Sequence, residues 1–88
     1  MEYRFGTVSI FMLPHQEQIE KMNMILSQHS KIILGRMGIP IPQGKINVIC
    51  LIIYGNTDQL GSLTGKLGHL PGVQVKSCLY KTEKAMNK

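Results

Sequence analysis

The sequence predicts an α+β domain of the ferredoxin-like class: a four-stranded antiparallel sheet with two helices on one face. Four segments have the residue pattern of strands and two have helical spacing. Their order along the chain is strand, helix, strand, strand, helix, strand, the split βαβ arrangement. With 88 residues, 43% of them hydrophobic and 17% charged, the chain suits one small globular domain.

The first half of the pattern is a strand over residues 3–12 followed by a helix. One face of the strand carries Gly6, Val8, Ile10 and Met12. The helix is expected to begin at Pro14, because a first helical position needs no N–H donor. Its apolar side carries Ile19, Met22, Ile25 and Leu26, with His29 on the same side. The helix is expected to end near residue 30.

Two further strands come next, at residues 31–39 and 45–55. The first is weakened by Gly35 and Gly38, as an edge strand can be, and the prolines of residues 40–44 predict a loop. Residues 45–55 are apolar on both faces, which is typical of a central strand covered on both sides. Helices cover one face, so we expect a second subunit on the other.

The last two elements are a helix and a strand. Asn56 or Thr57 can cap the helix, and leucines recur along it at helical intervals. Pro71–Gly72 then predicts a turn before the last strand. The residues expected to form the core between sheet and helices are Val8, Ile10, Leu60, Leu63, Leu67, Val73 and Val75.

The stretch GSLTGKLG, residues 61–68, superficially suggests phosphate binding. A P-loop has the pattern G-x-x-x-x-G-K-[ST] and precedes its helix. Here Gly61 and Gly65 are one residue too close, leucine follows Lys66, and the stretch lies inside a helix. We therefore interpret the glycines as a device for close packing of that helix on the sheet or the other helix. The alternative is close approach by a ligand or a partner chain.

Residues capable of metal binding or catalysis are few and scattered. His15 and His29 are about 21 Å apart along the first helix, and His69 closes the other helix, so no metal site is predicted.

The expected strand order is fourth, first, third, second, which puts Cys50 and Cys78 about 10 Å apart, too far for a disulfide. Both cysteines are expected to be small buried side chains. With no Ser-His-Asp set or paired carboxylates, we predict that the chain is not an enzyme.

The net charge of +5 is concentrated at the C-terminal end. Residues 76–88 hold four lysines against one glutamate, and we predict a domain over residues 1–81 with a flexible basic tail over 82–88. Lysines there can contact phosphates but cannot read bases, so no specific nucleic-acid binding is expected.

The sequence shows no leader pattern and no apolar run long enough for a membrane, which predicts a cytoplasmic protein.

Two stretches carry a family resemblance: ILGRMGIPIPQGKINVICLIIYG (residues 33–55) and SLTGKLGHLPGVQVKS (residues 62–77). They resemble the ACT-like family of iron-only hydrogenase system regulators, and the likeness extends from Arg4 to about Lys81. The resemblance implies an ACT-like βαββαβ domain that assembles as a homo-oligomer, a dimer or a tetramer, through its sheets or strand edges.

The same resemblance implies a regulatory function. ACT domains bind small effectors at subunit interfaces near the loop after the first strand, which here consists of Leu13, Pro14 and His15. These three residues are the predicted ligand-binding site, and no cofactor is identified. The alternative hypothesis is a structural or adaptor protein that binds a partner through a free sheet edge and has no ligand.

Overall fold

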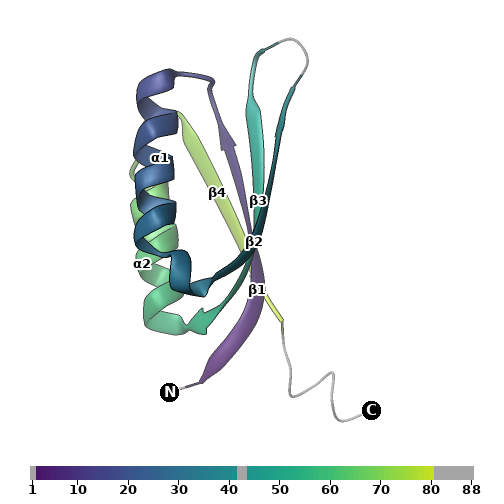
Figure 1. The fold of residues 1–88 in the computed structure, drawn as a ribbon, viewed down its shortest axis with the longest axis vertical. Coiled ribbons are helices and arrows are strands. Elements are labelled where there is room, and N and C mark those ends of the chain that lie inside the picture. The colour runs from purple at the N-terminus through teal and green to yellow at the C-terminus, as the bar shows by residue number, and fades with distance from the viewer. Residues whose placement is uncertain (1, 42–43, 81–88) are drawn as a thin grey trace.

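The computed structural model describes residues 2–41 and 44–80 of the chain. The elements in chain order are β1 (Tyr3–Met12), α1 (Gln16–Gln28), the 3-10 turn η1 (Ser30–Ile32), β2 (Ile33–Pro40), β3 (Asn47–Asn56), α2 (Thr57–Gly68) and β4 (Val73–Leu79). All strand pairs are antiparallel, and the strand order is β2-β3-β1-β4. Both helices lie on the same face of the sheet (Figure 1). The predicted fold class is confirmed.

The core lies between the two helices and the sheet. Its fully or nearly fully buried residues are Val8, Ile10, Met12, Met22, Leu26, Ile32, Ile49, Leu51, Ile53, Leu60, Leu63 and Leu67. Val73 and Val75 are half-buried against them. The predicted division of β1 into an inner and an outer face is confirmed, and so is the set of leucines packing from α2.

The helix beginnings differ from each other. The first helix begins at Gln16 with His15 as its N-cap, so the expectation that it begins at Pro14 is wrong. His15 makes no side-chain capping bond. In the second helix, Asn56 is the N-cap and forms a capping box with Gln59. The carboxamide of Asn56 accepts from the Gln59 N–H at 2.8 Å, and the Gln59 side chain accepts from the Asn56 N–H at 3.0 Å.

The connection between β2 and β3 covers residues 41–46, one residue longer than the predicted loop of residues 40–44. The second strand begins at Ile33, after η1, and continues to Pro40, which an edge strand tolerates. Gly44 has a φ of 67°, and its N–H donates to the Ile41 carbonyl at 2.8 Å. The turn predicted at Pro71–Gly72 is confirmed, because Gly72 has a φ of 72° just before β4 begins.

Two interpretations of small residues are wrong. A Cβ at Gly61 or Gly65 would meet no heavy atom within 4 Å, so these glycines do not serve close packing against the sheet or α1. Cys78 is exposed rather than buried, while Cys50 is half-buried. The cysteines lie on β4 and β3 with β1 between them, as expected, and both are free. The predicted tail, residues 82–88, lies outside the described residues.

Candidate functional site

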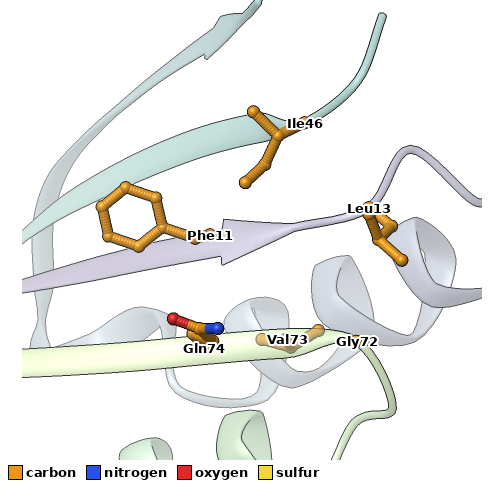
Figure 2. Close-up of a pocket in the computed structure, with 6 residues that line it drawn as sticks. All are labelled: Phe11, Leu13, Ile46, Gly72, Val73 and Gln74. Atoms are coloured by element: carbon orange, nitrogen blue, oxygen red, sulfur yellow. The ribbon is translucent and has the colours of Figure 1, made fainter.

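A groove lies at the sheet end where β1 finishes. Its volume is about 390 Å³. The groove is lined by Phe11, Leu13, Ile46, Gly72, Val73 and Gln74 (Figure 2). These residues come from β1 and the loop after it, from the segment entering β3, and from the start of β4. The register holds them together, since Phe11 pairs with Gln74 on β4 and with Val48 on β3.

Of the three predicted site residues, Leu13 lines the groove, and Pro14 and His15 do not. Leu13 lines the groove, is 45% exposed, and its N–H donates to the Gly72 carbonyl at 3.4 Å. Pro14 and His15 are exposed and belong to the loop and the N-cap, but they do not line the groove. The His15 N–H donates to the Leu13 carbonyl at 2.8 Å, which ties the start of α1 to the groove wall.

The groove is apolar, with one polar side chain. Phe11, Leu13, Ile46 and Val73 supply apolar surface, and Gln74 supplies an amide that can both donate and accept hydrogen bonds. None of the lining residues is charged. Such a site suits a small molecule with an apolar body and a hydrogen-bonding group. Of the lining residues, the predicted site included only Leu13, through the family resemblance. Gln74 reaches the groove through the pairing of β4 with β1, and Ile46 lies just before Asn47, which pairs with Met12.

The groove opens onto the sheet face that the helices leave uncovered, which we call the open face. The open face carries Tyr3, Phe5, Thr7, Ser9, Phe11, Met37, Ile39, Val48, Cys50, Ile52, Tyr54, Gln74, Lys76 and Cys78. Lys76 is the one charged residue among these strand positions. Several of the large apolar side chains are more than a third exposed, including Ile52 at 47% and Met37 at 62%.

At the opposite end of the open face, three aromatic rings form a cluster. The centroid of the Tyr54 ring lies 4.4 Å from that of Phe5 and 5.5 Å from that of Tyr3. No aromatic cluster was predicted from the sequence. The pairing of β1 with β3 places Phe5 directly opposite Tyr54 and so brings the rings together.

A second groove, of about 430 Å³, lies where α1 ends and α2 begins. Here His29 makes two ring hydrogen bonds, one with the Ile25 carbonyl at 2.8 Å and one with the Ser62 hydroxyl at 3.2 Å. No Ser-His arrangement was predicted from the sequence. The two residues are 33 positions apart and meet only because α1 and α2 pack side by side.

Two negative observations apply to residues 2–41 and 44–80. Their His, Cys, Asp and Glu side chains form no group of three that could hold a metal ion. No helix in that part of the chain is long and apolar enough to cross a membrane.

Solved structures share the fold. The uncharacterized protein TM1266 from Thermotoga maritima matches with a TM-score of 0.88 and 32% identity, covering 91% of this chain and all of that one. The ACT domain from GTP pyrophosphokinase of Chlorobium tepidum matches with a TM-score of 0.74 and 20% identity over 88% of this chain and 100% of that chain. The C-terminal domain of the MgtC protein from Mycobacterium tuberculosis gives 0.65 and 15%, over 90% and 89%. The fold is therefore ACT-like, as expected.

No curated protein matches the chain in sequence. Residues 4–77 match the family described as "TM1266-like: Iron-only hydrogenase system regulator, putative". This match covers most of the chain and includes both stretches that carried the resemblance. The chain belongs to this TM1266-like family.

Proposed function

We propose that this chain is a regulatory domain of an iron-only hydrogenase system that binds a small effector and acts as a homo-oligomer. The observation that carries the proposal is the apolar groove at the end of β1, next to the loop of Leu13, Pro14 and His15. The family described above supports the regulatory function. The domain has no catalytic turnover in this proposal.

The open face supports the homo-oligomer. An exposed apolar sheet face of this kind is unusual in a monomer and typical of an interaction surface. A second copy suits it because Lys76 is the one charged residue among the strand positions named above, so two such faces meet with little repulsion. Burial of Ile52, Met37 and the aromatic cluster would supply the free energy of association.

In this proposal, the position of the groove links effector binding to the association of two subunits. Phe11 and Gln74 are open-face residues as well as groove residues. A second copy on the open face therefore lies beside the groove, and an effector bound there contacts both subunits. An effector that binds the assembled state more tightly shifts the equilibrium toward it, and this is the regulatory step we propose.

A thermal-shift screen tests effector binding. Amino acids, nucleotides, small uncharged aromatic compounds and divalent metals are each added to the intact protein. A ligand at a hundred times its Kd stabilises the fold by about 2.7 kcal/mol and raises the Tm. The substitution Leu13→Ser removes groove wall and should abolish the shift, whereas Met24→Ser, at an exposed position on α1, should keep it. Equal shifts in both variants would contradict the groove as the binding site.

One observation supports the alternative hypothesis, that the chain is an adaptor protein. Edge strand β2 exposes Leu34, Met37 and Ile39 beside its free backbone groups. A protein partner could extend the sheet there. This function is favoured over effector binding if no compound in the screen changes the Tm while the isolated chain remains a monomer.

A further inference from the structure

The second groove, between the end of α1 and the start of α2, contains a hydrogen-bonded histidine and serine that have no role in the proposed effector binding. The groove is lined by Gln28, His29, Ser30, Lys31, Ile32, Asp58, Gln59 and Ser62. Ile32 is buried and forms an apolar floor, and the other seven side chains are polar or charged. The His29 ring is half-buried in this wall and Ser62 is exposed to the opening.

The hydrogen bonds of His29 fix which ring nitrogen carries the proton. A backbone carbonyl can only accept, so His29 Nδ1 must donate to the Ile25 carbonyl at 2.8 Å. In the neutral ring Nε2 is then the unprotonated nitrogen. The bond of 3.2 Å to Ser62 therefore has the Ser62 hydroxyl donating to Nε2.

This arrangement has the parts of an activated nucleophile. Ser62 Oγ is the nucleophile, His29 Nε2 is a base within hydrogen-bond reach, and the Ile25 carbonyl orients the base. The carbonyl takes the position that a carboxylate takes in a catalytic triad. Ile25 lies in α1, His29 is the C-cap of α1, and Ser62 lies in α2, so the packing of the two helices sets their relative positions.

We propose that Ser62 is an acyl-acceptor serine, modified by an activated acyl donor such as a thioester or an aryl ester. Ser62 Oγ attacks the carbonyl carbon of the donor while its proton passes to His29 Nε2. The bond from that carbon to the donor's sulfur or oxygen breaks. The leaving thiol or phenol takes the proton from His29, and Ser62 carries an ester. This step is stoichiometric and goes beyond the proposed effector function.

Two other groups in the groove provide internal comparisons. Ser30 lines the same groove and is exposed, but among the described residues it makes no hydrogen bond to an imidazole. Lys31 lines it too, and an ammonium group has no lone pair to attack with. Acylation that depends on the imidazole should therefore occur at Ser62 rather than at these neighbours.

The experiment is acetylation of the intact protein by p-nitrophenyl acetate and by an acetyl thioester, both at the same mildly alkaline pH. Intact mass and peptide mapping then locate the acetyl group. We expect it on Ser62, with no acetyl at this position in Ser62→Ala. His29→Asn can keep a donor for the Ile25 carbonyl but has no base, and should slow acetylation about 10²-fold. Ser30→Ala should react like the parent protein.

A further arm separates a chemical role of His29 from a structural one. His29→Ala removes the ring, and free imidazole added to this variant should restore part of the rate, while it should not act on Ser62→Ala. Circular dichroism melts establish that each variant is folded. Acetyl groups spread equally over Ser30, Lys31 and Ser62 would overturn the proposal. The same conclusion would follow if folded His29→Asn reacted as fast as the parent protein.

Discussion

Phe5 on β1 and Tyr54 on β3 lie directly opposite each other, and their ring centroids are 4.4 Å apart on the open face. Cross-strand aromatic pairs stabilise antiparallel sheets by fractions of a kcal/mol. Even in contact, the two residues remain 48% and 39% exposed. The sheet thus holds the rings in place within one chain and leaves their outer surfaces available for a second chain.

The first prediction is that Ile52→Lys gives a monomer. Ile52 is 47% exposed on central strand β3, so in a homo-oligomer formed through the open face it is buried. A lysine there would bury an unpaired charge, which is strongly unfavourable. Light scattering at micromolar concentration measures the result. Met24→Lys, at a 63% exposed position on α1, is the matched control and should leave the assembly unchanged. A parent protein that is already monomeric would contradict the open-face interface.

The second prediction concerns the outward-facing glycines of α2. Because a Cβ at Gly65 meets nothing within 4 Å, Gly65→Ala should raise the free energy of unfolding by about 0.5–1 kcal/mol through helix propensity. Urea unfolding at a protein concentration where the chain is monomeric measures this. A loss of stability would show that the glycine is needed within the chain. A stabilised fold with weaker self-association would instead indicate that a partner chain approaches this helix face.

The third prediction is that Gly6→Ala is destabilising. A Cβ at Gly6 would lie 2.6 Å from the Cys78 carbonyl oxygen and 2.8 Å from Leu79 Cδ2. The oxygen belongs to the backbone of β4 and cannot move without disturbing the β1–β4 pairing. We expect a loss of about 1–3 kcal/mol, as for overpacked cores. The same alanine substitution at Gly61, where nothing lies within 4 Å, is the control and should not destabilise. Equal unfolding midpoints for the two variants would be the contrary result.

The fold could be predicted from the sequence because the hydrophobic residues follow a strand or helix period along the whole length of several elements. The alternation in β1 placed Val8, Ile10 and Met12 on one face, although Met12 was not among the predicted core residues, and the leucine spacing in α2 identified Leu60, Leu63 and Leu67. The interpretation of Gly61 and Gly65 was wrong because a helix pattern shows which residues share a face without showing what that face meets. The beginning of α1 was misplaced for a related reason, since Pro14 is acceptable both at a first helical position and just before an N-cap.

The candidate sites were harder to predict than the fold. The family resemblance indicated the loop that contains Leu13. Gln74 joins Leu13 in the groove through the register of β4 with β1, and Ile46 does so from the segment just before β3. The contact of His29 with Ser62 depends on how two helices pack, and helix packing is not encoded in local spacing. Chemistry made from residues far apart in sequence therefore required the structure.

The fourth prediction tests the capping box of α2. Asn56→Ala removes the acceptor for the Gln59 N–H, and we expect a loss of about 1 kcal/mol in the free energy of unfolding. Gln59→Ala removes the reciprocal bond to the Asn56 N–H. Since the two bonds belong to one motif, the double variant should lose less than the sum of the single losses. Urea unfolding of the four proteins measures the coupling, and strict additivity would mean that the two bonds form independently.

The last prediction is that the chain alone does not bind DNA specifically. Its positive charge lies mainly in residues 76–88, and Lys76 is exposed on the open face, where an ammonium group can contact phosphates but does not enter a groove to read bases. Any binding should be weak, independent of sequence and steeply reduced by salt. Removing residues 82–88 deletes two lysines and one glutamate and should weaken it further. Gel-shift titrations at physiological salt compare candidate specific duplexes with scrambled duplexes, using the full chain and the chain without residues 82–88. Tight binding to one sequence that survives the deletion would mean that the folded domain itself, rather than its basic end, recognises DNA.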